Sequence, residues 1–289
     1  PVKIGSKNFT EQLILGEMYA QLLEAAGIPV ERRLNLGGTA VAQAALVKGD
    51  IDLYPEYTGT GLTVVLDIPI ESIQQATPVA GAEAAATPAA ASIDERVYQI
   101  VKDEYKKRWN LVWLDPVPFN NTQALAVKKD FADEKKLVTI SDLAKIAGDL
   151  TIVAPSDFVE RPDGLKGLEQ FYGMKFGNVL SVEPGIRYQA LENDQAQVVL
   201  AFGTDGQVAG MNLVLLKDDK GLWPPYHVAP VVRQETLDAY PNLADTLNKV
   251  APLLTDLVMS WLYWKVDGPD KGETADVAKA FLQENKLVS

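Results

Sequence analysis

Two cationic residues stand on polar loops that join a predicted strand to a predicted helix, namely Lys7 and Arg161. A loop of this kind points backbone N–H groups and a helix N-terminus at an anion. The two loops therefore indicate a site for a negatively charged group. The alternative for Lys7 is a solvated side chain. The alternative for Arg161 is a surface salt bridge within its own loop, to Asp157, Glu160 or Asp163.

A tyrosine follows a short apolar strand in the stretch that is richest in candidate site residues. The strand predicted at residues 51–54 ends at Pro55, and Tyr57 then lies where the chain turns. Gly59 and Gly61 can take backbone conformations closed to other residues, which brings main chain close to a ligand. In parallel α/β sheets the ligand lies beyond the carboxyl ends of the strands, so we expect this ring to face the same crevice as the cationic loops. The alternative is a buried core tyrosine.

Strand and helix patterns alternate along the first part of the chain. Thr10 is the predicted N-cap of an amphipathic helix that ends at Gly27. The other predicted elements here are strands at residues 2–6, 30–36 and 51–54, and a helix at residues 40–48 that follows a Gly-Gly-Thr turn. This order is typical of a parallel α/β sheet. The Gly-Gly-Thr turn lacks a complete phosphate-binding motif and is weak evidence by itself.

Two proline-containing joints divide the chain, at residues 116–122 and 222–232. The segment between them repeats the strand, polar loop and helix pattern, and another ring, Phe202, stands at a strand's carboxyl end. We expect the chain to cross between two lobes at these joints. His227, beside the second joint, is more readily explained as a structural residue than as a catalyst. Residues 74–92 are rich in Ala and Pro, and we expect a surface insertion there.

Composition excludes several classes of protein. The 289 residues carry a formal net charge of -12, which argues against coating nucleic acid or an anionic membrane. Cysteine is absent and histidine occurs once, so thiolate nucleophiles, disulfides and histidine-rich metal sites are disfavoured. No apolar run is long enough to span a membrane. The chain begins at Pro1 without an initiator Met, so we expect that a leader or lipid-anchor segment has been removed.

Six motifs in the same order resemble the substrate-binding proteins of ABC importers for glycine betaine, choline and related osmoprotectants. They are residues 4–12 (IGSKNFTEQ), 52–61 (DLYPEYTGTG), 120–122 (NNT), 161–165 (RPDGL), 203–206 (GTDG), and Pro225-Tyr226 ahead of Ala229-Pro230-Val231-Val232. The resemblance implies the type II periplasmic binding protein fold: two α/β lobes, each with a central, mostly parallel sheet. It places lobe I at residues 1–118 plus 226–289 and lobe II at residues 119–225, with the ligand between them.

The resemblance also implies roles for individual residues. An aromatic cage surrounds a trimethylammonium group, because that group has no N–H to donate and ring faces attract cations. Tyr57, Phe202 and Tyr226 match cage positions, and Lys7, Thr60 and Arg161 match contacts to a ligand carboxylate. Asn121, Thr204 and Asp205 lie in matching motifs and are further candidate ligand contacts.

Two positions depart from the family pattern. Gln123 stands where many relatives have an aromatic residue, and Phe202 stands where Tyr is common. Phe202 keeps a ring face and Gln123 does not, so we expect an incomplete cage. Either the affinity for glycine betaine is then weak or the ligand differs, with Gln123 donating to a polar group. Phe119 and Trp223 are the candidates to complete the cage.

The resemblance implies an extracytoplasmic solute receptor that acts as a monomer and delivers a small zwitterionic or cationic ligand to a membrane permease, without a cofactor. A binding protein of the same fold for another zwitterionic or amino-acid-like solute is the first alternative. An enzyme on the same scaffold is a second, and turnover of a ligand would reveal it. A third alternative is a ligand-sensing domain, whereas a neighbouring permease and ATPase gene pair would favour transport.

Overall fold

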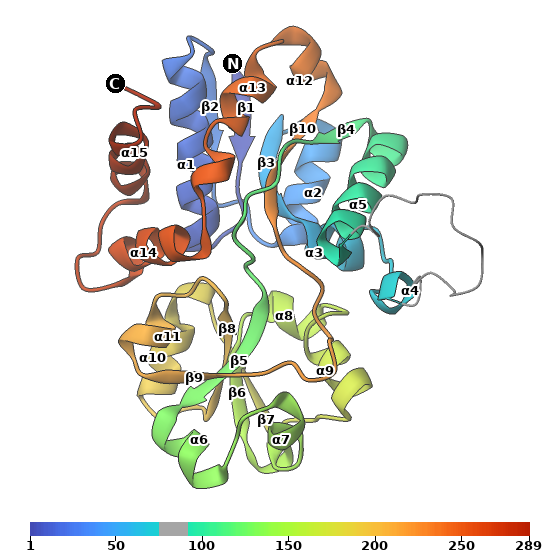
Figure 1. The fold of residues 1–289 in the computed structure, drawn as a ribbon, viewed down its shortest axis with the longest axis vertical. Helices are drawn as coiled ribbons and strands as arrows, with labels where there is room; N and C mark the ends of the chain where they lie inside the picture. Colours follow the sequence, from blue (N-terminus) through green and yellow to red (C-terminus); the bar gives the residue numbers. More distant parts are fainter. Residues whose placement is uncertain (75–91) are drawn as a thin grey trace, which may run out of the picture.

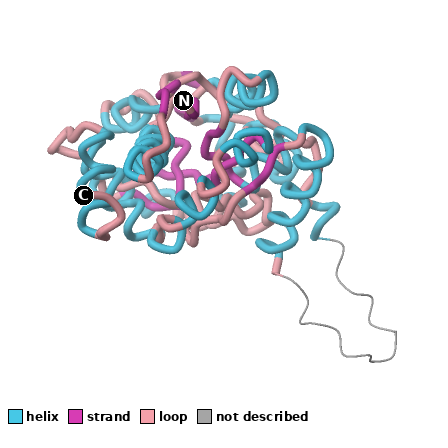
Figure 2. The backbone as a smooth tube through the Cα atoms, turned by 90° about the horizontal axis from the view of Figure 1, so that it is seen from above, coloured by secondary structure: helices cyan, strands magenta, loops and turns pink. Residues whose placement is uncertain are grey.

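The computed structural model describes residues 1–74 and 92–289, which form two lobes joined by two segments (Figure 1). Apart from its two end residues, the insertion expected at residues 74–92 lies outside the described residues. Both ends of the chain lie in the first lobe, the upper one in Figure 1. Figure 2 shows the strands in the middle with helices around them.

The first lobe is built on a five-stranded sheet with the order β2-β1-β3-β10-β4. The strands are β1 (Val2–Gly5), β2 (Val30–Arg33), β3 (Leu53–Tyr57), β4 (Leu111–Trp113) and β10 (Val228–Arg233). Its helices before the first crossing are α1 (Thr10–Ala25), α2 (Thr39–Lys48), α3 (Thr58–Thr60), the π-helix η1 (Gly61–Val65), α4 (Glu71–Gln74) and α5 (Ile93–Trp109). The helices after the second crossing are α12 (Gln234–Ala239), α13 (Leu243–Asn248), η4 (Ala251–Leu253), α14 (Asp256–Asp267) and α15 (Thr274–Glu284).

The second lobe has a five-stranded sheet with the corresponding order β7-β6-β8-β5-β9. The strands are β5 (Gln123–Lys128), β6 (Thr151–Ala154), β7 (Asn178–Ser181), β8 (Val198–Phe202) and β9 (Leu213–Leu216). The helices are α6 (Lys129–Lys135), α7 (Ile140–Ala144), η2 (Ala147–Asp149), α8 (Ser156–Glu160), α9 (Leu165–Tyr172), η3 (Pro184–Ile186), α10 (Arg187–Glu192) and α11 (Gln207–Gly210).

Both sheets are mixed and mostly parallel, as expected, because four of the five strands in each run in the same direction. In the first lobe β1 is parallel to β2 and β3, whereas β10 is antiparallel to β3 and β4. In the second lobe β6 is parallel to β7 and β8, whereas β5 is antiparallel to β8 and β9. The strands β5 and β10 are those that follow a crossing. Because they enter their sheet at the edge where the neighbouring parallel strands end, they run in the opposite direction.

Alternating side chains of each sheet serve two separate cores. Leu53 and Tyr57 of β3 belong to the same cluster as α1, whereas Tyr54 between them packs with α2 and α5. In the second lobe Leu125 points into the cluster that continues from the first lobe, and Ala126 points into the cluster beneath α10. This alternation follows from the two-residue period of a strand. It places helices on both faces of each sheet.

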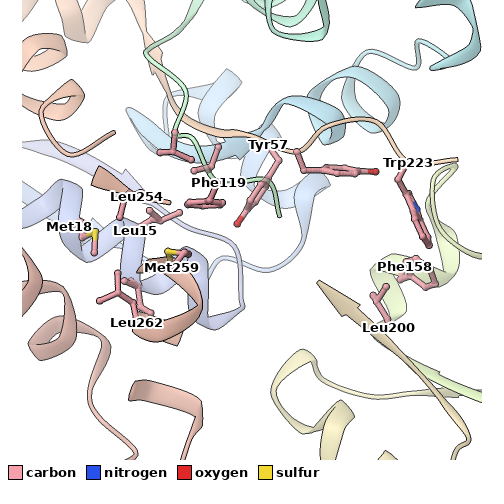
Figure 3. Close-up of a cluster of buried hydrophobic side chains, with 14 of the residues drawn as sticks. Leu15, Met18, Tyr57, Phe119, Phe158, Leu200, Trp223, Leu254, Met259 and Leu262 are labelled. Carbon is pink, nitrogen blue, oxygen red and sulfur yellow. The ribbon is translucent and has the colours of Figure 1, made fainter. Parts of the chain in front are cut away.

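One hydrophobic cluster runs through both lobes. Its members include Tyr57 of the first lobe, Phe119 of the first joining segment, and Phe158 and Leu200 of the second lobe. Figure 3 shows Tyr57 close to Phe119, and the indole of Trp223 pointing toward Phe158. The two lobes therefore share part of their buried apolar surface.

The two joining segments lie side by side and are hydrogen-bonded to each other. The amide of Asn121 donates to the carbonyl of Tyr226 at 3.1 Å, and the amide of Val117 donates to the carbonyl of Val228 at 2.9 Å. His227 adds a side-chain link, because its Nδ1 lies 3.0 Å from the carbonyl oxygen of Val117 and 2.9 Å from that of Phe119. The residues at which one lobe gives way to the other stay a prediction.

Three local expectations were wrong. The strand β3 continues through Pro55, which faces Pro230 across the ladder, so both strands lack an N–H at this position. Gly61 has φ -56° and ψ -41°, a right-handed conformation open to any residue. The N-cap of α1 is Phe9 without a side-chain cap, and the hydroxyl of Thr10 donates instead to Asp267 Oδ1 at 2.8 Å.

Candidate ligand-binding site

A cavity of about 400 Å³ lies between the lobes, within the usual range for small-molecule sites. Residues of both lobes form its wall. The first lobe and the segment that leads into β10 contribute Lys7, Asn8, Phe9, Gly38, Thr39, Ala40, Val41, Tyr57, Thr60, Tyr226 and Tyr263. The first joining segment and the second lobe contribute Asn121, Gln123, Pro155, Ser156, Asp157, Phe158, Glu160, Arg161, Val182, Glu183, Pro184, Arg187, Leu200 and Phe202.

Most of the candidate site residues from the sequence meet at this cavity. Those that line it are Lys7, Tyr57, Thr60, Asn121, Gln123, Arg161, Phe202 and Tyr226. Thr204 and Asp205 are not among the lining residues, although both are buried close by. The register of the second sheet explains one juxtaposition, since Gln123 on β5 stands directly opposite Phe202 on β8 at the edge that faces the cavity.

Three rings of the wall lie in nearly parallel planes. The centroid of Phe9 is 6.1 Å from that of Tyr57 with planes 25° apart, and 6.5 Å from that of Phe202 with planes 7° apart. Phe9 was not predicted as a site residue. It stands on the same polar loop as Lys7. An aromatic ring among the polar residues that follow a strand could have identified it as a candidate site residue.

The two residues expected to complete the cage do not line the cavity. Phe119 is fully buried in the shared cluster. Trp223 is also largely buried, and its Nε1 donates to the carbonyl oxygen of Asp163 at 2.8 Å. Phe158 and Tyr263 are instead the further rings of the wall.

Lys7 forms a buried ion pair at one end of the cavity. Its Nζ lies 2.6 Å from Glu56 Oε1 and donates to Thr39 Oγ1 at 3.1 Å. The same atom is 5.1 Å from the centroid of the Tyr57 ring. Burial lowers the pKa of Lys7, and the charge of Glu56 opposes that change.

Arg161 pairs with a carboxylate of its own loop, but this pair is largely buried and not the surface salt bridge of the alternative, and Arg161 also lines the cavity. Its Nε donates to Asp163 Oδ1 at 2.6 Å and its Nη2 donates to Asp163 Oδ2 at 2.6 Å. Nη2 also donates to Thr60 Oγ1 at 3.2 Å, which links the two lobes. Burial would lower the pKa of Arg161, but the charge of Asp163 raises it above its ordinary value.

Gln123 belongs to the same polar network. Its Nε2 donates to Asp163 Oδ2 at 2.9 Å and to the hydroxyl of Tyr226 at 2.8 Å. The Tyr226 hydroxyl in turn donates to Asp163 Oδ2 at 2.5 Å. Gln123 and Asp163 together therefore fix the orientation of the Tyr226 hydroxyl. In the sequence alone, Asp163 does not differ from the surface acids around it.

A second buried carboxylate, Glu11, lies behind Tyr57. It accepts from the hydroxyl of Tyr57 at 2.6 Å and from Asn121 Nδ2 at 2.8 Å, both on Oε1. Its Oε2 accepts from Thr204 Oγ1 at 2.7 Å, a contact from the second lobe. Burial raises the pKa of Glu11 to about 7, although these hydrogen bonds oppose the shift.

A third ion pair, between Arg187 and Asp205, supports the second-lobe wall. Arg187 Nη2 lies 2.6 Å from Asp205 Oδ2, and the same oxygen accepts from the amide of Phe202 at 2.9 Å. The guanidinium carbon of Arg187 is 5.3 Å from the centroid of the Phe202 ring. Asp205 thus positions a lining cation and a lining ring.

Comparison with known proteins assigns this architecture. Residues 1–284 match the family model described as the substrate binding domain of ABC-type glycine betaine transport system. The chain belongs to this family. Its two-lobed α/β fold is therefore the type II periplasmic binding protein fold expected from the sequence.

Curated relatives of this substrate-binding family are similar over most of the chain. The ergothioneine transport permease/ergothioneine binding protein of Helicobacter pylori is 34% identical over 284 residues, which cover 98% of this chain and 47% of that protein. This chain thus spans about half the length of that relative. The glycine betaine-binding protein YehZ of Escherichia coli is 35% identical over 260 residues, covering 86% of this chain and 79% of that protein.

A solved structure agrees with the family assignment. The crystal structure of a glycine betaine/carnitine/choline ABC transporter matches with a TM-score of 0.73 and 30% identity, over 99% of both chains. The relatives are transport binding proteins, which supports a role in binding rather than in catalysis. Over residues 1–74 and 92–289, no helix combines the length and apolar character that crossing a bilayer requires.

Proposed function

We propose that this chain is the extracytoplasmic solute receptor of an ABC importer and that it binds a small quaternary-ammonium osmoprotectant between its lobes. Glycine betaine, choline and carnitine are the candidate ligands. The observation that carries the proposal is the group of parallel rings Phe9, Tyr57 and Phe202 on the cavity wall. Ring faces attract a trimethylammonium group by about 0.5 to 2 kcal/mol each when water is excluded.

The polar end of the ligand is proposed to lie near Lys7, Thr60 and Arg161. These residues line the same cavity as the rings, and Thr60 already accepts from Arg161. Gln123 and Asn121 supply amide groups next to this end. Thr204 and Asp205 are proposed to act indirectly, because their hydrogen bonds position Glu11, Phe202 and Arg187.

A membrane permease is the proposed protein partner, with this chain acting as a monomer. The name of the Helicobacter pylori relative joins a permease and a binding protein, and the relative is about twice as long as the part matched here. The same name makes ergothioneine, another betaine, a candidate ligand to be tested beside the osmoprotectants.

Isothermal titration calorimetry or intrinsic tryptophan fluorescence tests this function. The ligands are glycine betaine, choline, carnitine, proline betaine, ectoine and ergothioneine. At least one quaternary-ammonium compound should bind, and 3,3-dimethylbutanol, which has the shape of choline without its charge, should bind at least about tenfold more weakly. Failure of every quaternary-ammonium ligand would refute the proposal. Binding of ectoine alone would favour a different zwitterion.

A further inference from the structure

Asp157, in the first turn of α8, reaches across the cavity toward the first lobe. Its Oδ2 lies 3.4 Å from Arg161 Nη1. Its Oδ1 faces Gly38, since a β-carbon added to Gly38 would come within 3.0 Å of that oxygen. One carboxylate of the protein therefore lies between the guanidinium group of Arg161 and the residue that precedes α2.

This position is the one that a ligand carboxylate would seek. Arg161 supplies positive charge, and Gly38 is the N-cap of α2 without a side-chain hydrogen bond at that helix end. Unpaired amides and the helix dipole there attract anions. The carboxylate of Asp157 already occupies this position, between the Arg161 guanidinium group and the N-terminus of α2.

The other lining cations are also neutralised by the protein. Lys7 has Glu56 at 2.6 Å, and Arg187 has Asp205 at 2.6 Å, with all four side chains buried. Among the described residues, every lysine and arginine on the wall thus has a carboxylate partner. The wall carries Glu160 and Glu183 in addition. A ligand carboxylate would meet no uncompensated positive charge.

We propose that Asp157 makes this cavity select quaternary-ammonium ligands with a neutral polar end over those that carry a carboxylate. The proposal rests on the function proposed above and names the ligand class. A hydroxyl such as that of choline can still bond to Thr60 and to the remaining N–H groups of Arg161. A carboxylate such as that of glycine betaine must displace the carboxylate of Asp157 or lie next to it, where like charges repel.

The preference should be moderate, because the Asp157 side chain is 45% exposed and can turn toward water. Solvent screening reduces the energy of such a charge. We expect choline to bind about tenfold more tightly than glycine betaine, the ratio that one partly screened charge supports. Choline and glycine betaine carry the same trimethylammonium group, so an effect of Asp157 on lobe closure should change both affinities alike. Their affinity ratio therefore separates the effect of charge from any effect of Asp157 on closure.

Calorimetry on Asp157→Asn tests the proposal directly. This variant keeps the side-chain shape and removes the charge, so the choline to glycine betaine affinity ratio should fall about five- to tenfold. Asp157→Glu, which keeps the charge, should retain the choline preference. Asp149→Asn is the matched control, since Asp149 is exposed in the same lobe and is not part of the wall. Its ratio should equal that of the unmodified protein.

Two results would overturn the proposal. The first is equal or tighter binding of glycine betaine by the unmodified protein. The second is an unchanged ratio in Asp157→Asn while its thermal unfolding matches that of the unmodified protein. If the unmodified protein binds neither choline nor glycine betaine, the selectivity proposal fails, whereas the function proposed above fails only if no quaternary-ammonium ligand binds.

Discussion

Two tyrosines of the wall donate their hydroxyl groups to buried carboxylates, Tyr57 to Glu11 at 2.6 Å and Tyr226 to Asp163 at 2.5 Å. A phenol that donates to a charged acceptor forms a short, strong hydrogen bond, which fixes the ring. The added electron density also makes the ring face more attractive to a cation. Both pairs should therefore make these rings stronger partners for a cation.

Two substitutions of Tyr57 distinguish the contribution of its ring from that of its hydroxyl group. Tyr57→Phe keeps the face but leaves Glu11 with one donor fewer, so we expect a loss of about 1 to 3 kcal/mol in the free energy of unfolding and a small change in affinity. Tyr57→Ala removes the face as well and should weaken binding at least about tenfold beyond Tyr57→Phe. Urea unfolding and calorimetry measure the two effects. Equal affinities for both variants would remove Tyr57 from the cage.

The raised pKa of Glu11 predicts a specific dependence of stability on pH. Its pKa is about 7 in the folded protein and 4.5 in the reference state, so the folded protein binds the proton more tightly. The stability from this group is therefore fully present below pH 4.5 and is lost as pH rises through about 7. The loss amounts to up to about 3 kcal/mol.

Urea unfolding between about pH 5 and about pH 8 measures this slope in the unmodified protein and in Glu11→Gln. The variant should lack the decrease. Asp163 has a lowered pKa because Arg161 outweighs its burial, and its contribution is lost in the opposite direction, as pH falls. The difference in slope between the unmodified protein and Glu11→Gln therefore gives the contribution of Glu11 alone. Identical slopes would show that Glu11 does not titrate in this range.

Sequence patterns predicted eight residues of the wall, but not the buried roles of Glu11 and Asp163. Lys7, Arg161 and Phe202 could be recognised because each stands on a loop or strand end that must face the crevice. Glu11 and Asp163 could not be recognised, since an acid in the first turn of a helix or beside an arginine is usually a solvated surface residue. Their burial depends on contacts from the other lobe or from a distant segment, such as Thr204 and Tyr226.

At the scale of elements, the turn from β3 into α3 is shaped by the segment that crosses above it. A β-carbon on Gly59 would lie 2.8 Å from Pro224, from the carbonyl oxygen of Pro225 and from the ring of Tyr226. Glycine is therefore required at this position for space. The sequence predicted close approach at this turn but assigned it to a ligand, because no local pattern shows that a segment more than a hundred residues later packs there.

Gly59→Ala should move the crossing segment and the Tyr226 ring with it. We expect a loss of about 1 to 3 kcal/mol in the free energy of unfolding, as for other overpacked sites, and weaker binding of the ligand. Gly148→Ala is a suitable control because nothing lies within 4 Å of the added atom. Thermal unfolding and calorimetry on both variants provide the comparison. A Gly59→Ala protein that matches the control in both measurements would contradict this account.

Local sequence patterns do not report contacts between distant residues, and this also explains which features of the sheets could be predicted. Apolar periodicity located most strands and helices, since it depends on neighbours in sequence. The antiparallel placement of β10 between β3 and β4 depends on residues far apart in the chain. The expected mostly parallel order holds for β1, β2, β3 and β4 of the first lobe and for β6, β7, β8 and β9 of the second, and only β10 and β5 run against it.

At the scale of the molecule, hydrogen bonds and packing hold the lobes together around the cavity. Thr204 of the second lobe donates to Glu11 of the first, and Arg161 donates to Thr60. The lobes also pack directly, since Trp264 of α14 lies against Gly206 and Gly210, where added β-carbons would lie 3.0 and 2.6 Å from its side chain. A ligand that touches both walls adds to these contacts and should favour the closed arrangement.

Closure can be measured in two independent ways. A ligand at about 100 times its Kd should raise the free energy of unfolding by about 2.7 kcal/mol, because it binds only the folded protein. Small-angle X-ray scattering should show a smaller radius of gyration at the same concentration. An increase in stability without compaction would indicate that the lobes are already closed before the ligand binds.

The position of β10 also determines the order in which the protein can assemble. This strand lies between β3 and β4, yet it follows the whole second lobe in sequence. Among the described residues, the edges of β3 and β4 that pair with β10 have no other strand partner, so they stay unpaired during synthesis until residues 228–233 emerge. The second lobe is contiguous and can fold first, whereas the first lobe must wait for the end of the chain. A nascent chain that stops short of β10 therefore cannot complete the sheet of the first lobe.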